Sequence, residues 1–213
     1  MSAREEILRR VREAVAGAPE APSVDRSYRS ADSTRPGAYS TRPSADSTRP
    51  GADSTGLFVE RVRDYRAVVE TCAEADVEER IALALQGKPR VLVPEGLPWT
   101  VPGAVVDAGF PAAELDGFDA VVTGATLGIA ETGTIVLTHG PGEGRRAITL
   151  VPDVHVCVVR SRDVVAGVPD AVAALDPTRP MTWVSGPSGT SDIELDRVEG
   201  VHGPRTLHVL VVG

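Results

Sequence analysis

The stretch Ala120-Val121-Val122-Thr123-Gly124-Ala125-Thr126 decides the fold class. Its first residues form a short, mostly apolar run without the alternation of a half-exposed strand. Runs of this kind are typical of strands that are covered on both faces, as in parallel sheets. The glycine and small hydroxyl residues that follow indicate that the strand ends in a loop.

Similar strands are expected on both sides of this stretch, at residues 67–71, 90–93, 105–106, 133–138, 155–160, 182–185 and 207–212. Helical patterns lie between them, at residues 57–63, 76–86 and 164–175, and the last contains Pro169, which disfavours a continuous helix. The alternation predicts an α/β fold with a mostly parallel sheet and flanking helices. The consecutive strands from residue 133 to 160 suggest an inserted antiparallel element.

Three segments of different composition divide the chain. Residues 1–17 are predicted to form an N-terminal docking helix, because their apolar side chains fall on one face at helical spacing. Residues 18–56 contain a nine-residue repeat that starts at Ser30 and again at Ser44, and they offer little to bury. We expect a disordered linker there, with a phosphoregulated or partner-docking tail as the alternative. Residues 57–213 are expected to form one α/β domain.

The composition excludes several classes of protein. Thirty acidic and 22 basic residues give a net charge of -8, and no basic run is present, which argues against nucleic-acid binding. No stretch is apolar enough to span a membrane, and no signal region follows Met1, so a cytoplasmic location is expected. The two cysteines, Cys72 and Cys157, exclude a disulfide framework and an iron–sulfur cluster held by this chain alone.

The first of three glycine-rich segments covers residues 123–134 and predicts an anion site. Glycines allow backbone N–H groups to approach an anion, and threonine hydroxyls add donors. The expected substrate-binding residues are Gly124, Thr126, Gly128, Thr132, Gly133 and Thr134. Glu131, among small and apolar neighbours, is a candidate nucleophile or base, and the alternative is a carboxylate that caps a turn.

The second segment, residues 138–146, has the composition of a hairpin turn and ends in Arg145 and Arg146. This arginine pair is either a clamp for an acidic substrate or part of a solvated turn.

The third segment, residues 185–194, predicts a loop and the start of a short helix. A helix N-terminus beside a glycine- and serine-rich loop binds phosphate or carboxylate, and simple capping is the alternative. The expected substrate-binding residues are Gly186, Ser188, Thr190, Asp192 and Glu194. Beyond this loop, His202 is a candidate for proton transfer. His155 and Cys157 share one face of a strand, where packing is the simpler explanation than metal binding, and no metal site is expected.

Four motifs, in order, resemble the LUD domain of the lactate utilisation protein C family. They are GIAETGT at residues 128–134, LVPDVH at 150–155, GPSGTSDIE at 186–194 and GVHGP at 200–204. The resemblance covers most of residues 57–213. It implies a fold similar to the ribose-5-phosphate isomerase and CoA-transferase class, and a role in oxidising L-lactate to pyruvate alongside iron–sulfur partner subunits.

The same resemblance implies a candidate chemical role for Glu131, that of a nucleophile. In distantly similar CoA-transferases, a glutamate in a glycine-containing loop is the nucleophile, and residues 130–133 are loosely similar to that loop. No cofactor is expected in this chain, and the iron–sulfur cluster is expected on a partner subunit.

Three hypotheses for the function follow. The first is a subunit of an iron–sulfur-dependent system that oxidises L-lactate. The second is a free-standing enzyme that uses Glu131 on an anionic acyl-CoA or phosphosugar-like substrate. The third is a non-catalytic module that binds a carboxylate in its loops. Calorimetry with L-lactate separates the third from the others, because only the third predicts tight binding without any partner.

Overall fold

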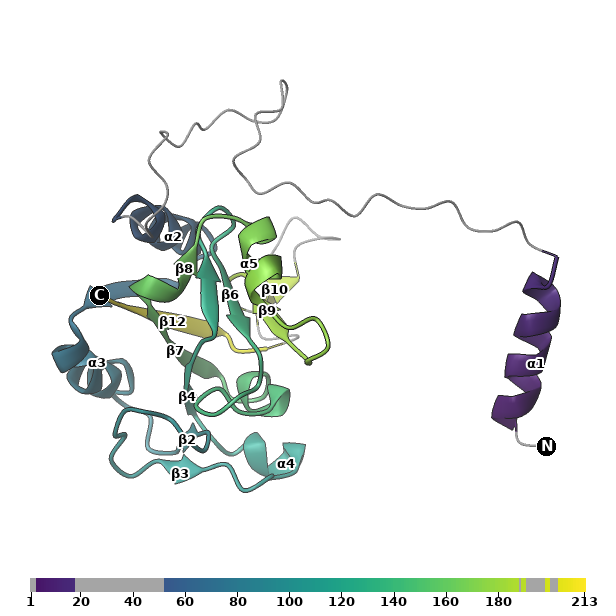
Figure 1. Cartoon of the computed structure of the whole chain (residues 1–213). Coiled ribbons are helices and arrows are strands. Elements are labelled where there is room, and N and C mark those ends of the chain that lie inside the picture. Colours follow the sequence, from purple (N-terminus) through teal and green to yellow (C-terminus); the bar gives the residue numbers. More distant parts are fainter. Residues whose placement is uncertain (1–2, 18–51, 188, 191–197, 200–202) are drawn as a thin grey trace.

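The computed structural model describes residues 3–17, 52–187, 189–190, 198–199 and 203–213 (Figure 1). Predictions for other residues, including most of the expected linker, lie outside the described part. No helix in the described ranges is long and apolar enough to cross a membrane.

Two sheets and a set of short helices make up the described chain. The α-helices are α1 (Ala3–Val15), α2 (Ala52–Asp64), α3 (Val77–Ala84), α4 (Ala112–Leu115) and α5 (Val168–Ala174). The 3-10 helices are η1 (Glu74–Asp76), η2 (Arg146–Thr149) and η3 (Ser161–Asp163). The strands are β1 (Val68–Cys72), β2 (Val91–Val93), β3 (Val105–Val106), β4 (Ala120–Gly124), β5 (Leu127–Ile129), β6 (Thr134–Leu137), β7 (Val154–Arg160), β8 (Val164–Val165), β9 (Thr182–Val184), β10 (Gly189–Thr190), β11 (Val198–Glu199) and β12 (Thr206–Val212).

The larger sheet confirms the predicted α/β fold. Its six strands run in the order β1-β12-β7-β4-β2-β3, and every neighbouring pair is parallel. β4, which contains the run quoted first, lies in the middle, and the side chains of its first four residues are buried. The strands β7 and β2 flank it, and both are mostly apolar. Strands covered on both faces have no solvent side to fill with polar residues.

A second sheet carries the inserted antiparallel element, and it contains only one of the two strands predicted for that element, β6. Its order is β8-β5-β6-β9, in which β6 pairs antiparallel with β5 and β9. The strand at residues 155–160 is instead part of the parallel sheet. β5 lies inside the segment that was expected to be a loop, and β8 replaces the first turn of the expected helix 164–175. That helix begins only at Val168, with Pro169 in its first turn, where proline is tolerated.

Four apolar clusters fill the space between the layers. One cluster joins α2 and the inner strands of the second sheet to one face of β1, β12 and β7, and it centres on Phe58. Another covers the opposite face of the large sheet with α3 and Trp99. A third lies between β2, β4, α4 and η2, and a fourth between the second sheet and α5. Figure 1 shows α5 on the outer side of the second sheet.

The N-terminal helix is present as predicted, but its apolar side chains are solvent-exposed. Ile7, Val11 and Val15 are each more than half exposed, and Figure 1 draws α1 apart from the α/β domain. Glu6 and Arg9 form an exposed ion pair at 2.7 Å on its polar face. The first helix of the domain, α2, starts at Ala52, within the stretch that was expected to be linker.

Candidate functional site

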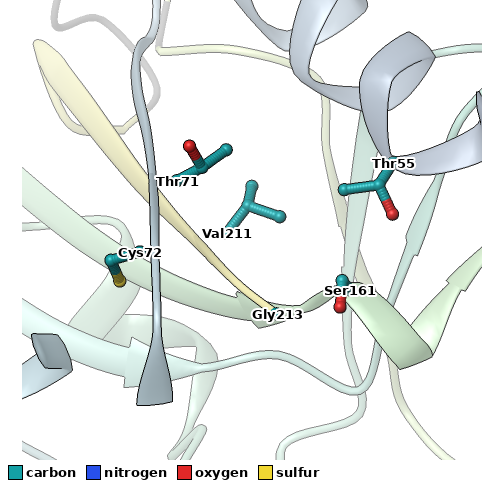
Figure 2. A pocket seen from close by; sticks show the side chains of 6 residues that line it. All are labelled: Thr55, Thr71, Cys72, Ser161, Val211 and Gly213. Carbon is teal, nitrogen blue, oxygen red and sulfur yellow. The ribbon is translucent and has the colours of Figure 1, made fainter. Parts of the chain in front are cut away.

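Cavities open at both ends of the large sheet in the described part of the domain. The larger, about 300 Å³, lies at the carboxyl ends of β1, β12 and β7, where α/β sheets commonly bind ligands. Figure 2 shows its walls, which are formed by Thr55, Thr71, Cys72, Ser161, Val211 and Gly213. None of these side chains is charged, and none was among the predicted site residues, so this cavity has no cationic side chain that could hold an anion.

The second cavity, about 160 Å³, contains several predicted residues and is here called the Arg146 cavity. It lies between η2, the first residues of β7 and β12, and β9 with the loop after it. Its polar walls are formed by Arg146, Thr149, His155, Thr182, Ser185 and Gly186. At about 30 Å³ per water molecule, the space corresponds to about five waters, which is the size of a small organic acid.

Arg146 gives the Arg146 cavity its positive charge. The arginine lies in the first position of η2, and its Nη1 donates a hydrogen bond to Thr182 Oγ1 at 2.9 Å. Thr182 in turn lies 2.9 Å from Nε2 of His139, whose Nδ1 is 2.9 Å from the carbonyl oxygen of Gly144. Because a carbonyl only accepts, Nδ1 of His139 donates and Nε2 accepts from Thr182. The remaining N–H groups of Arg146 are left to bind a carboxylate.

Arg145, the other half of the predicted clamp, is already paired. Its Nε and Nη2 donate to both carboxylate oxygens of Asp107, at 2.7 and 3.0 Å, and Nη2 also reaches the carbonyl oxygen of Phe110 at 2.6 Å. This side chain lowers the pKa of Asp107, whose carboxylate is 9% exposed. Arg145 therefore holds the 107–110 loop in place, and Arg146 alone faces the cavity.

His155 forms the floor of the Arg146 cavity and is 1% exposed. Its Nε2 lies 2.8 Å from Thr123 Oγ1 on the neighbouring strand β4. Burial lowers the pKa of His155 to about 4, so the imidazole is neutral at physiological pH. Strand packing is the simpler explanation of this histidine in the sequence, and its buried position on β7 agrees with that, but the residue also lines a polar cavity.

The hydroxyl residues predicted at the end of the first glycine-rich segment connect to the cavity. Thr132 and Thr134 lie 2.7 Å apart through their Oγ1 atoms, and Thr134 Oγ1 lies 2.8 Å from Ser185 Oγ, in the cavity wall. Gly186, from the third predicted segment, follows directly and has a φ of 91°. A side chain at Gly186 would meet Cβ of Tyr65 at 2.5 Å, so glycine is required there for packing as well.

Gly124 and Thr126 are engaged by the 139–144 turn instead of facing either cavity. The N–H of Gly124 donates to the carbonyl oxygen of Gly142 at 2.8 Å. Thr126 Oγ1 donates to Glu143 Oε1 at 2.6 Å, and the backbone N–H of Thr138 donates to Oε2 of the same carboxylate at 2.6 Å. Glu143 is 7% exposed and ties the turn to the start of β5.

Gly128 and Gly133 have a packing role against α2. A Cβ on Gly128 would meet the ring of Phe58 at 2.9 Å, and a Cβ on Gly133 would meet the backbone of α2 at 2.7 Å. Gly133 also has a φ of 61°. The glycine spacing that predicted an anion loop is thus used here to bring a strand and a turn close to a helix.

Glu131 lies exposed in the turn between β5 and β6, and it lines neither cavity. The predicted Ser188, Asp192, Glu194 and His202 lie outside the described residues. Thr190 belongs to β10 and pairs with Val198, whereas a loop and the start of a short helix were expected in this segment. Within the described ranges, no group of three or more His, Cys, Asp or Glu side chains gathers where a metal ion could bind.

Three polar residues of the site were missed by the sequence analysis. Thr149 and Thr182 border the Arg146 cavity, and the buried Glu143 supports the turn that precedes Arg146. Thr182 could have been suspected as a hydroxyl residue at the start of a strand, but nothing in its neighbourhood showed that β9 would face η2. Such contacts join residues 36 apart in the chain and depend on the tertiary fold.

Comparison with known proteins assigns the domain to a family. The family model described as LUD domain matches residues 57–212. A protein from Deinococcus radiodurans named Lactate utilization protein C is 48% identical over 165 residues, which are 73% of this chain and 78% of that protein. A protein of the same name from Halalkalibacterium halodurans is 33% identical over 102 residues, or 44% of each chain.

A solved structure agrees with this assignment. The crystal structure of a DUF162 family protein from Deinococcus radiodurans superposes with a TM-score of 0.66 and 41% identity, covering 76% of this chain and 98% of that one. The matched region contains both sheets and the Arg146 cavity. The chain therefore belongs to the LUD domain family.

Proposed function

We propose that this chain is a lactate-utilisation protein, which binds L-lactate in the Arg146 cavity as a subunit of a cytoplasmic, iron–sulfur-dependent system that oxidises L-lactate to pyruvate. The observation that carries the proposal is the 48% identity with a protein named Lactate utilization protein C over most of both chains. The Arg146 cavity supports it, because one guanidinium among hydroxyl groups suits a small monocarboxylate.

In the proposed system, the electrons released by lactate oxidation must pass from this chain to an acceptor elsewhere. Oxidation of lactate to pyruvate releases two electrons and two protons. Cys72 lies on β1 and Cys157 on β7, with β12 between them, so these thiols do not fit the four-thiolate set of a cluster. We therefore place the iron–sulfur acceptor on a partner subunit.

The geometry supports a free-standing Glu131 enzyme less well. A nucleophile must reach the reacting atom of a bound substrate. Glu131 is exposed and lies outside both cavities. Its backbone N–H donates a hydrogen bond to the carbonyl oxygen of Ala166.

Affinity purification of the tagged chain from host cells grown on L-lactate tests the proposal. We expect a cysteine-rich, iron-containing partner in the eluate and dye-linked oxidation of L-lactate by the complex, with none by the chain alone. Arg146→Gln should remove the oxidation without changing the partner's recovery. Arg162→Gln removes an exposed arginine that is 3.9 Å from Asp163 and lines neither cavity, and it serves as the matched control.

Two results would contradict the proposal. Recovery of the chain alone from lactate-grown cells, with growth on lactate unaffected by its deletion, would reject the subunit role. Lactate binding by the isolated chain, with no iron-containing partner in the eluate and no oxidation in any fraction, would favour the carboxylate-binding module instead.

A further inference from the structure

A line of hydrogen-bonding groups runs through the buried face of the large sheet behind the Arg146 cavity. Nε2 of His155 lies 2.8 Å from Oγ1 of Thr123. Thr123 Oγ1 lies 3.8 Å from Sγ of Cys157, and that sulfur lies 3.7 Å from the carbonyl oxygen of Gly124. All three side chains are buried, with 0 to 1% of their surface exposed.

The direction of these bonds follows from their end point. The carbonyl of Gly124 can only accept, so the Cys157 thiol donates to it. Burial raises the pKa of Cys157 to about 12, so the thiol keeps its proton. The sulfur is then free to accept from the Thr123 hydroxyl, and Thr123 accepts in turn from His155. This arrangement uses all three buried donors, whereas the reverse orientation of the hydroxyl would put the imidazole proton on Nδ1, which has no partner among the described residues.

The line of bonds therefore sets the tautomer of His155. Its proton is on Nε2, and Nδ1 carries a lone pair. Nδ1 has no hydrogen-bond partner among the described residues, and His155 is one of the residues that line the Arg146 cavity. A nearly fully buried imidazole beside this cavity thus keeps an acceptor that no described residue uses, and Arg146 supplies donors to the same cavity.

Resting on the function proposed above, we propose that His155 Nδ1 accepts a hydrogen bond from the hydroxyl group of a 2-hydroxy carboxylate held by Arg146, so that the cavity selects 2-hydroxy acids over 2-oxo acids and unsubstituted acids. A 2-oxo acid places a carbonyl oxygen opposite the lone pair of Nδ1, and two acceptors cannot form a hydrogen bond. An unsubstituted acid leaves Nδ1 without a partner. A site that pairs with a ligand hydroxyl discriminates strongly against analogues that lack it. Thr123 acts as a positioning residue, because it orients the ring without facing the ligand.

Calorimetry on the full chain tests the selectivity with three probes, L-lactate, pyruvate and propionate. We expect L-lactate to bind at least about tenfold more tightly than either of the other two. Thr123→Val should remove this preference and leave the weaker carboxylate binding, while Thr123→Ser keeps a hydroxyl and should restore the preference. Equal affinity for the three acids would overturn the inference and leave the proposed function intact, provided that Arg146→Gln still abolishes binding.

Nitrogen-15 NMR of the histidine-labelled native chain reads the tautomer without any stability penalty, with His155→Gln used to assign the signal. We expect a neutral ring protonated on Nε2. A ring protonated on Nδ1 would overturn the inference whatever the binding data show. Absence of binding by any of the three acids would reject the carboxylate site itself, and with it the role of His155.

Discussion

At the scale of single residues, the buried imidazole of His155 makes the free energy of unfolding depend on pH. The pKa is about 4 in the folded chain and 6.5 for an unperturbed histidine. Between these values the unfolded chain takes up a proton that the folded chain excludes, so the folded state loses stability as the pH falls from 6.5 to 4. The loss amounts to at most about 3 kcal/mol.

Urea unfolding of the wild-type chain and of His155→Gln at several pH values between 7 and 4 measures this contribution. For a domain of this size, the unfolding free energy falls by about one to three kcal/mol per molar of urea. We expect the variant to lose less stability over this range than the wild type, whatever its stability at pH 7. Parallel pH profiles for the two proteins would show that His155 is not the group responsible.

The two neighbouring arginines should separate stability from binding. Arg145 pairs with both oxygens of a carboxylate that is 9% exposed, so Arg145→Gln leaves Asp107 poorly paired and should cost about 1–3 kcal/mol. Arg146 is exposed, so Arg146→Gln should change the unfolding free energy by about 0.5 kcal/mol or less. Thermal unfolding and lactate calorimetry on both variants check the pair. A larger stability loss in Arg146→Gln than in Arg145→Gln would contradict the assignment.

At the scale of elements, Gly128 decides how closely β5 approaches α2. A methyl group there would overlap the ring of Phe58, which is fully buried and has no room to move aside. Gly128→Ala should therefore destabilise the domain by about 1–3 kcal/mol.

Gly56 supplies the matched control within α2 itself. It is exposed, and nothing lies within 4 Å of an added Cβ. Gly56→Ala should stabilise the helix by about 0.5–1 kcal/mol. Chemical unfolding of both variants measures the contrast. If Gly128→Ala is neutral while lactate affinity falls, Gly128 lies in a binding loop after all, and the packing explanation fails.

These glycines also show how far the sequence predicts the structure. The buried strands were predictable because an apolar run such as that of β7 records local burial, and the α/β class follows from their alternation with helices. The second sheet was predicted only in part. β5 has only three residues, one of them Gly128, so its sequence gives little strand signal, and pairing with β6 and β8 makes it a strand.

The candidate site was predicted less well than the fold, for a similar reason. Arg146, Thr134 and Gly186 were recognisable from their chemistry, but the sequence does not show that Arg145 meets Asp107, 38 residues away, while Arg146 remains available. His155 illustrates the same limit, because strand packing and a place in a cavity wall give the same sequence pattern.

At the scale of the whole molecule, α1 is a helix without an apolar environment. Its 13 residues are too few for a stable isolated helix in water, and Ile7 and Val11 are 61% and 53% exposed. The exposed ion pairs on its polar face contribute little, because solvent screens them. In the structure, α1 therefore contributes little to the stability of the domain, and its apolar face remains free for contacts with other molecules.

Removal of residues 1–17 tests this separation of roles. We expect the truncated chain to keep the melting temperature and lactate affinity of the full chain, because both depend on the domain alone, and to lose recovery of the iron-containing partner. The double variant Ile7→Ser, Val11→Ser changes only the apolar face and should act in the same way, whereas Arg12→Gln, on the polar side, should retain the partner. A melting temperature lowered by several degrees in the double variant would contradict this separation, because it would show that α1 packs on its own domain in solution. A shift of that size corresponds to a stabilisation of about 1 kcal/mol.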